Sequence, residues 1–311
     1  MKMFVRLLGG AALMSICVSA PVFAAEGGMG AWLKGYGSFM AGVVPPEPGF
    51  YGTDLYYYFG GHAGAEVRNG NVELGVDVML NGDMLAGMYV SDWHILGGTY
   101  MAAAAVDYIW ANLDASIQTP LGGREVSLDA SDIGDSLLVP FLIGWSDGNL
   151  HWNVGLNILA PSGAYNVHQL SVGKNVWGFM PQFAFTYFDP KTGFDLSGTL
   201  VYTTLTENHA TQYQSGDAIN LDWAIGKHFG AKSEWEAGIA GNLVQQVSDD
   251  SGPGAKLGPF KAASYGIGPA ISYSTLLGGF ATSFSARWEH DIDASNTFKG
   301  DIAVVSATVK F

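Results

Sequence analysis

The side chains best suited to chemistry in this chain do not form a known catalytic pattern. The seven histidines, at positions 62, 94, 151, 168, 209, 228 and 290, include no His-Glu-x-x-His zinc motif. The chain also has no Gly-x-Ser-x-Gly nucleophile motif. Ser171 and Lys174 match a Ser-x-x-Lys pattern, but this spacing is common by chance and falls in an expected loop. We therefore predict no catalytic residues and no enzymatic activity.

The acidic residues could bind a metal ion or set the charge of a pore. The chain has 14 basic and 28 acidic residues and a net charge of −14, which would repel nucleic acid. Two acidic stretches, 127–135 and 248–254, could hold a divalent ion against lipopolysaccharide phosphates, but neither has EF-hand spacing. We expect both to be solvated loops, and we predict no nucleic-acid partner, no metal site and no cofactor.

The elements that carry these side chains are predicted to be β-strands. Past residue 50 the dominant sequence period is two, and most candidate strands are about ten residues long, the length of a tilted membrane-spanning strand. Short turns alternate with long loops, as in outer-membrane barrels. The sequence thus predicts an all-β fold, a single-domain transmembrane antiparallel β-barrel of about twelve strands. The candidates are about 50–59, 72–80, 103–113, 136–145, 150–159, 177–188, 193–205, 218–229, 234–246, 263–275, 280–291 and 301–311.

Two long stretches between the predicted strands are expected to have other structures. Residues 81–102 fall where a short turn would maintain the alternation, so they are expected to form a small periplasmic helix or a segment folded into the lumen. Residues 114–135 are expected to form a long external loop. After the N-terminal leader, no uninterrupted apolar run is long enough for a helical membrane span.

The two faces of the predicted strands differ in chemistry. Large apolar side chains such as Trp152 and Val154 alternate with small or polar ones such as Asn153. Few of the polar side chains are long and charged, which fits a lipid-facing exterior and a narrow polar lumen better than a soluble sheet. The predicted lumen-lining residues are His151, Asn153, Asn157, Gln182, Asp195, Asn220, Asp222, His228, Glu234, Glu236, Arg287 and Glu289.

The ionisable residues of the predicted lumen allow two interpretations. They could set ion preference and orient the polar ends of substrates, in which case the acidic excess predicts a mild cation preference. Alternatively, groups such as Arg287 and Glu289 neutralise each other across a narrow lumen, and we favour this pairing.

Aromatic residues cluster near the predicted strand ends. Tryptophan and tyrosine in such places are typical of the girdles at membrane interfaces, whereas the alternative is the core of a soluble protein. The predicted girdle consists of Trp145, Trp152, Trp177, Tyr187, Trp223, Trp235, Tyr273, Trp288 and Phe311.

The N-terminus has the pattern of a secretory signal peptide. Lys2 and Arg6 are basic, an apolar stretch follows, and compact residues up to Ala24 favour cleavage after this position. The single cysteine, Cys17, would be removed with this peptide, leaving no thiol for a disulfide. The predicted division is a signal peptide at 1–24, an N-terminal periplasmic or lumenal segment at 25–49 and an outer-membrane β-barrel at 50–311.

Several motifs resemble one family. VVPPEPGFYGTDLYYYF (43–59) and GDSLLVPFLIGW (134–145) are followed in order by NILAPSGAYN, GKNVWGFMPQFAFTYF and ENHATQYQSGDAINLDWAIGKHF. Together, over about residues 43–311, they resemble the meta-pathway phenol-degradation family of outer-membrane β-barrel channels. The resemblance implies a monomeric twelve-stranded channel associated with the degradation of aromatic or other hydrophobic compounds. The catabolic name of the family does not imply an enzyme.

Residues and resemblance together predict a Gram-negative outer-membrane channel for passive uptake of small hydrophobic or aromatic compounds. The expected partners are outer-membrane lipid and lipopolysaccharide, the small hydrophobic or aromatic substrate, and the barrel-assembly machinery, through a last strand ending at Phe311. The alternative is a structural or partner-binding barrel with little conductance. The proline-rich stretch 43–50 could be a plug of the pore or a plain spacer.

Overall fold

The computed structural model describes residues 30–67, 72–119, 122–256, 258 and 260–311. The predicted signal peptide, residues 1–24, lies outside the described residues. We find in the described residues no helix of the length and apolarity needed to cross a membrane. The strands are β1 (Gly49–Val67), β2 (Val72–Ile95), β3 (Gly98–Thr119), β4 (Gly122–Ile133), β5 (Ser136–Asp147), β6 (Leu150–Ala160), β7 (Gly178–Asp189), β8 (Phe194–Leu205), β9 (Ala218–Phe229), β10 (Trp235–Gln246), β11 (Ala263–Leu277), β12 (Phe280–Ser295) and β13 (Lys299–Lys310).

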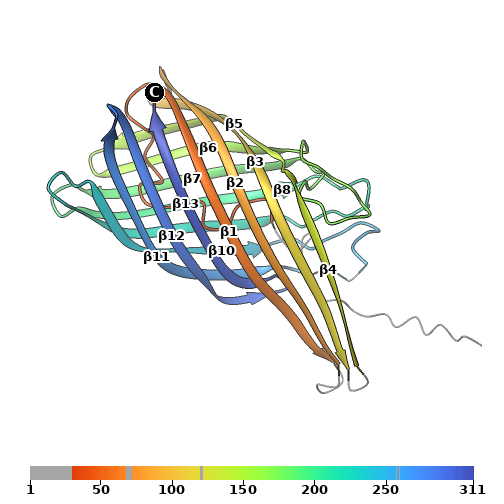
Figure 1. The fold of residues 1–311 in the computed structure, drawn as a ribbon. Helices are drawn as coiled ribbons and strands as arrows, with labels where there is room; N and C mark the ends of the chain where they lie inside the picture. Colours follow the sequence, from red (N-terminus) through yellow and green to blue (C-terminus); the bar gives the residue numbers. More distant parts are fainter. Residues whose placement is uncertain (1–29, 68–71, 120–121, 257, 259) are drawn as a thin grey trace, which may run out of the picture.

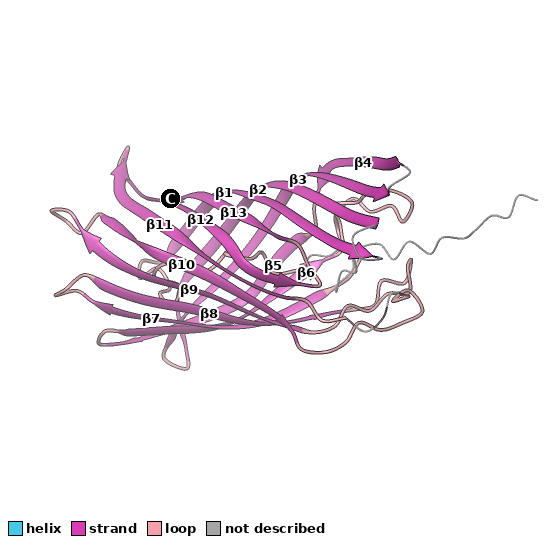
Figure 2. Ribbon diagram, turned by 90° about the horizontal axis from the view of Figure 1, so that it is seen from below, coloured by secondary structure: helices cyan, strands magenta, loops and turns pink. Residues whose placement is uncertain are grey.

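Twelve of these strands close into an antiparallel barrel (Figures 1 and 2). Each of the twelve pairs with the next of them along the chain, so that β3 pairs with β5, and β13 pairs with β1. Closure matters because an open sheet edge in lipid would leave backbone N–H and C=O groups without partners, at several kcal/mol each. The predicted fold class, an all-β antiparallel barrel of about twelve strands, is confirmed.

The prediction for residues 81–102 is wrong. These residues belong to β2 and β3, which pair continuously from Val90 and Met101 outward and are joined by a tight turn at Leu96 and Gly97. Both turn residues have positive φ, 51° and 79°, as two-residue hairpins require. The sequence obscured the strands because glycines and the alanine run 102–105 weaken the alternation of large and small side chains. The connection is therefore a short turn and neither a helix nor a segment folded into the lumen.

The expected loop at 114–135 is also wrong, because a hairpin occupies it. The outer half of β3 pairs with β4, from Tyr108 opposite Ile133 to Thr119 opposite Gly122. The inner half of β3 pairs with β5 instead, over Thr99–Ala105. Among the described strands β4 pairs with β3 alone, so the outer parts of β1 to β4 extend beyond the rest of the barrel (Figure 1).

The outer surface of the barrel is apolar, as contact with lipid requires. On β7, for example, Phe179, Phe183 and Tyr187 are more than one-third exposed, whereas Met180 and Ala184 between them are buried inside. We assign the end that carries the long loops after β6, β8 and β10 to the outside, and the opposite end, where all connections are short, to the periplasm, following the usual arrangement of such barrels.

Candidate functional site

The inner surface of the barrel has an apolar side and a polar side. From β13 through β1, β2, β3 and β5 the buried inward side chains are mainly aliphatic or aromatic, for example Tyr57, Val139 and Ile302, and we call this side the apolar wall. From β6 to β12 the buried inward side chains are mainly polar, and we call this side the polar wall. Its members include Asn153, Asn157, Thr186, Asp195, Ser197, Thr199, Thr203, Asn220, Asp222, Glu236, Asn242, Arg287, Glu289 and Asp291.

Residues 30–48, which we call the lumen segment, lie inside the barrel before β1 begins (Figure 1). Near the outer ends of β6 and β7, Trp32 packs against a cluster that includes Leu159 and Met180. Further along, Phe39 packs against small alanines of β9, β10 and β11. The segment leaves the barrel at the periplasmic end, where Gly49 starts β1. It therefore fills much of the lumen along its length.

Asp222 of β9 is the main anchor of the lumen segment. Its carboxylate accepts hydrogen bonds from Trp32 Nε1 at 3.0 Å and from the backbone N–H groups of Gly35 and Gly37, each at 2.9 Å. A Cβ at Gly37 would lie 2.8 Å from the Asp222 Cβ, so this close approach requires a glycine.

Charged groups of β12 hold the same part of the segment. The Lys34 ammonium forms a 2.9 Å ion pair with Asp291, and the Arg287 guanidinium donates to the Gly37 carbonyl. Arg287 Nε also lies 3.8 Å from Glu289 Oε1. Because buried charges are stable only when paired, these contacts fit the interpretation that the lumen charges neutralise one another.

The lower part of the segment is hydrogen-bonded to β6 and β7. The Gly42 N–H donates to Thr186 Oγ1 at 2.9 Å, and Asn153 Nδ2 donates to the Ala41 carbonyl at 2.9 Å. A Cβ at Gly42 would overlap the backbone of Thr186 and His151. These hydrogen bonds are all with the polar wall, whereas Leu33 of the segment packs against the apolar wall.

At the periplasmic end, Glu47 ties the lumen segment to the last strand. The Lys310 ammonium donates to the Glu47 carboxylate. This hydrogen bond, with the attraction of the positive charge, holds the pKa of Glu47 below its usual range. The Glu47 side chain is 70% exposed, so the pair positions the segment more than it stabilises the barrel.

A cavity of about 120 Å³ lies between the lumen segment and part of the apolar wall, which Leu33 of the segment also contacts directly. Its lining is predominantly apolar, and apolar cavities of roughly 150 Å³ hold a benzene ring. One side-chain atom in the lining, Asp107 Oδ1, is buried without a hydrogen-bond partner among the described residues. The lining residues are Ala31, Trp32, Leu33, Tyr36, Met84, Ala105, Val106, Asp107, Asp135, Leu137, Leu159 and Met180.

The structure places almost all predicted lumen residues on the polar wall or beside it. His151, Asn153 and Asn157 share the inner face of β6, and Gln182 hydrogen-bonds to both asparagines. The other predicted lumen residues that are buried or mostly buried inside the barrel are Asp195, Asn220, Asp222, His228, Glu236, Arg287 and Glu289. His228 Nε2 lies 3.2 Å from a Glu236 oxygen.

Glu234 departs from the predicted lumen set. It precedes β10 in a periplasmic turn, where its carboxylate accepts the Lys232 N–H at 2.7 Å. Backbone N–H groups, its own first, hold the pKa of Glu234 below its usual range. The inward direction predicted for Glu234 depended on the alternation of faces along a strand, but β10 starts only at Trp235. Glu234 therefore does not line the lumen.

The predicted girdle residues lie mostly at the periplasmic end. Trp145 stacks with Trp152 at 6.3 Å between ring centroids, and Trp235 contacts Tyr273 at 4.4 Å. Tyr187 and Phe311 are also exposed at this end, whereas Trp177 is exposed at the outer end of β7. Trp223 and Trp288 lie near the middle of β9 and β12 and are therefore on the lipid-facing wall rather than in a girdle.

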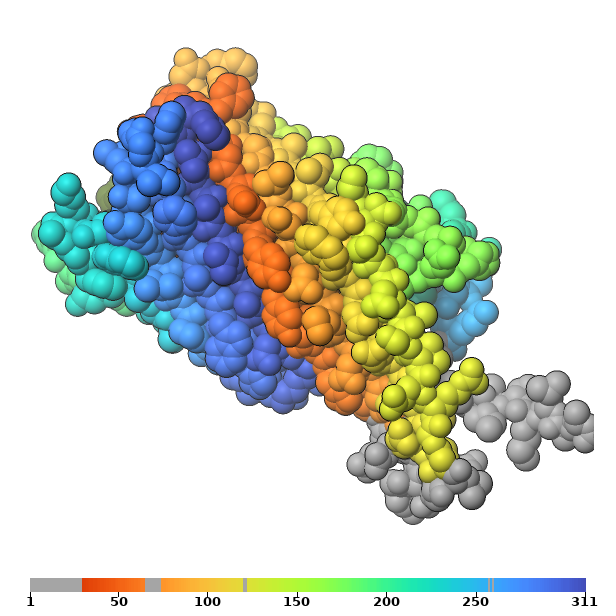
Figure 3. Space-filling model, in the orientation of Figure 1, coloured from red at the N-terminus to blue at the C-terminus, as the bar shows by residue number. Residues whose placement is uncertain are grey.

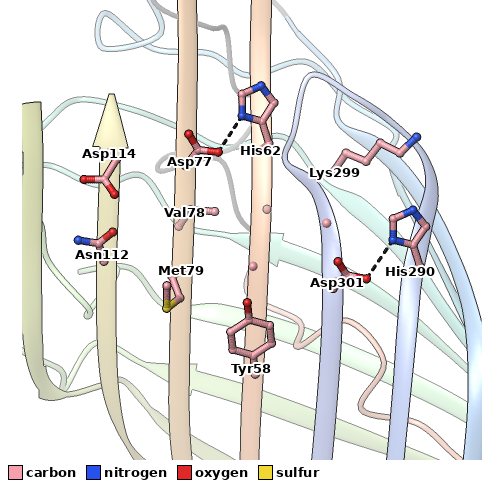
Figure 4. A pocket seen from close by; sticks show the side chains of 13 residues that line it. Tyr58, His62, Asp77, Val78, Met79, Asn112, Asp114, His290, Lys299 and Asp301 are labelled. Carbon is pink, nitrogen blue, oxygen red and sulfur yellow. Dashed lines mark hydrogen bonds and ion pairs between the residues drawn. The ribbon is translucent and has the colours of Figure 1, made fainter. Parts of the chain in front are cut away.

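A second hollow, of about 480 Å³, lies on the outside of the barrel wall (Figure 4). His62 pairs with Asp77 at 2.8 Å and His290 with Asp301 at 3.0 Å, and Lys299 lies close by. The sheet separates this polar hollow from the lumen. Within the described residues, no group of three or more His, Cys, Asp or Glu side chains could hold a metal ion.

Sequence reasoning missed the partners supplied by the lumen segment. Trp32, Lys34 and Tyr36 line the cavity or bind the polar wall, yet they lie in a stretch without strand periodicity. The glycines at 35, 37 and 42 were the available signal, because they permit close approach of one backbone to another.

A family model described as MetA-pathway of phenol degradation matches residues 61–306, most of the barrel. The chain belongs to this family. Members of the family are thus expected to share the barrel whose strands span the matched residues. A comparison with curated protein sequences gives no match.

Solved structures with the same fold are outer-membrane β-barrels. The chain resembles the crystal structure of an outer-membrane channel from Pseudomonas putida F1, with a TM-score of 0.63, 12% sequence identity, and coverage of 86% of this chain and 97% of that one. It also resembles the β-domain of the Bordetella autotransporter BrkA, with a TM-score of 0.45, 11% identity, and coverage of 85% and 100%. At 12% identity the likeness to the Pseudomonas putida channel establishes the fold alone.

Proposed function

We propose that this family member is an outer-membrane channel for passive uptake of small hydrophobic or aromatic compounds. The observation that carries the proposal is the cavity between the lumen segment and the apolar wall. The segment is hydrogen-bonded to the polar wall, so space for a passing molecule remains on the apolar side. Water and ions gain little from such a surface, whereas an apolar ring is stabilised by leaving water.

The cavity lining favours an aromatic compound with one polar group. Trp32, Leu33, Met84 and Leu137 offer apolar contact, and Asp107 Oδ1 is an acceptor without a partner. A hydroxyl group on an aromatic ring could donate to it, and an unpaired buried acceptor costs about 1–3 kcal/mol until a donor arrives. Ligand sites commonly combine apolar walls with a small number of polar groups in this way.

Filling the cavity is expected to block uptake. Ala105 faces the cavity from β3, and its neighbour Ala104 points outward. We expect Ala105→Trp to lose most of the protein-dependent uptake of radiolabelled toluene by cells that express it. Ala104→Trp carries the same substitution toward lipid and is expected to keep wild-type uptake.

Migration of unboiled protein in gels verifies that each variant is folded, and Ala105→Phe replaces Ala105→Trp if the larger ring prevents assembly. Wild-type uptake by a folded Ala105→Trp barrel would exclude the cavity as the route. Equal uptake with and without the wild-type protein would contradict the channel and favour a structural barrel with little conductance. The dense contacts of the lumen segment would then explain the low conductance.

A further inference from the structure

The outer parts of β1 to β4 form a sheet that stands clear of the barrel, and we call it the flap. It consists of residues 60–67, 72–78, 112–119 and 122–129 (Figures 1 and 3). β2 has 24 residues, twice the 12 of β7, and at about 3.3 Å per residue it is about 80 Å long. The apolar band of an outer-membrane barrel is about 25 Å tall, so the flap extends well beyond the lipid.

The inner face of the flap continues the apolar wall and has two apolar rows that cross all four strands, with Arg124 of β4 beyond them near the tip, opposite Ile117. The strand registers place Val76, Ala115 and Val126 in one row and Val78, Leu113 and Leu128 in the next. Val76 and Val78 are buried, whereas Val126 and Leu128 are 45% and 44% exposed. An apolar surface outside the membrane costs free energy unless something covers it at times.

The outer face of the same sheet is polar. His62, Asp77 and Asp114 line the hollow in Figure 4, and Asn112 Nδ2 donates to Asp129 Oδ1 at 2.8 Å. The outer face of the flap is therefore polar where the lipid-facing side of the membrane-spanning wall is apolar, whereas the inner face is apolar in both. The apolar rows of the flap thus face the barrel axis and not lipid.

The inner face of the flap is continuous with the cavity. Leu113 and Ala115 pack against a buried cluster that contains Val76 and Val78, and Leu33 and Met84 pack against the same cluster. Leu33 and Met84 also line the cavity. Apolar side chains in contact thus lead from the exposed rows of β3 and β4 down to the proposed substrate route.

We propose that the inner face of the flap is an outer capture surface for small hydrophobic molecules. A molecule adsorbs on the rows of β3 and β4 and moves along β2 and β3 into the cavity, remaining in contact with apolar side chains. This proposal rests on the proposed function, because the captured molecule is the substrate of the channel. The flap raises the local concentration of a poorly soluble compound at the outer mouth.

A charge placed on the inner face tests this role. Leu128 and Ser127 are adjacent exposed residues of β4. Leu128 points to the inner face of the flap and Ser127 points to the outer face. We expect Leu128→Lys to raise the half-saturating toluene concentration for uptake several-fold and to leave the maximal rate unchanged. Ser127→Lys, with the same charge on the outer face, is expected to leave both quantities at wild-type values, and Val126→Lys repeats the inner-face test.

Photolabelling with benzophenone gives a readout that does not depend on transport. Under ultraviolet light, benzophenone is expected to attach to inner-face residues of β3 and β4 in the reconstituted protein and not to residues of the outer face. Mass spectrometry of the labelled protein identifies the attachment sites. Equal labelling of both faces, or unchanged half-saturation in folded Leu128→Lys and Val126→Lys, would overturn the capture surface. If Ala105→Trp nevertheless blocks uptake, the proposed function remains and the flap proposal alone fails.

Discussion

Asp222 connects the polar wall to three donors of the lumen segment, namely Trp32 Nε1 and the backbone N–H groups of Gly35 and Gly37. Hydrogen bonds to a charged acceptor contribute about 1.5–3 kcal/mol each. Alternation along β9 was enough to predict that Asp222 faces the lumen, because period two assigns faces reliably inside a strand. Its partners could not be predicted, because they belong to a segment without periodicity that lies 185 or more residues away.

Removal of the Asp222 carboxylate should loosen the lumen segment and widen the water-filled part of the lumen. We expect Asp222→Ala to raise single-channel ion conductance in planar bilayers several-fold. Asn220→Ala, two residues away on the same face, removes a hydrogen bond to Thr203 and none to the lumen segment, so it should conduct like wild type. Unchanged conductance of a folded Asp222→Ala barrel would show that the segment does not depend on this anchor.

The lumen segment behaves as an element of its own, held at one end by β9 and β12 and at the other by the Glu47–Lys310 pair. Because the pair lowers the pKa of Glu47, its contribution is present above the unfolded-state pKa and is lost as pH falls through the folded-state value. The contact between Glu47 and Lys310 is therefore expected to weaken on acidification, when the Glu47 carboxylate becomes protonated.

Replacing Lys310 is expected to return the Glu47 carboxyl to an ordinary pKa. An NMR titration of the labelled glutamate carboxyl should show a higher pKa in Lys310→Met than in wild type, because the donor and its positive charge are gone. Lys310→Arg keeps the charge and should keep the pKa low. A wild-type titration curve for Lys310→Met would mean that the pair does not form in solution.

Strands with large apolar residues at every second position could be predicted from sequence, and strands without them could not. In β6, Trp152, Val154 and Leu156 mark one face clearly. In β3 the alanine run 102–105 carries no such signal, and β4 was hidden because its polar residues resemble those of a loop. The extension of β1 to β4 beyond the lipid depends on pairing between distant residues, which local patterns do not report.

The whole molecule combines a closed barrel with a lumen that differs from one side to the other. The predicted polar lumen describes β6 to β12, whereas β13, β1, β2, β3 and β5 have an apolar inner face. This division gives the lumen segment a wall to bind and leaves an apolar route along the other. The flap extends the apolar wall outward, so capture and passage of a hydrophobic molecule would use one continuous surface.

The most direct test is a crystal structure of the protein soaked with bromobenzene, in which anomalous scattering locates the bromine. We expect a bromine peak in the cavity between Trp32 of the lumen segment and Leu137 of the apolar wall, and no such peak in the Ala105→Trp variant. Bromine found on the lipid-facing surface, with the cavity empty at saturating ligand, would contradict passage of hydrophobic compounds along the apolar wall.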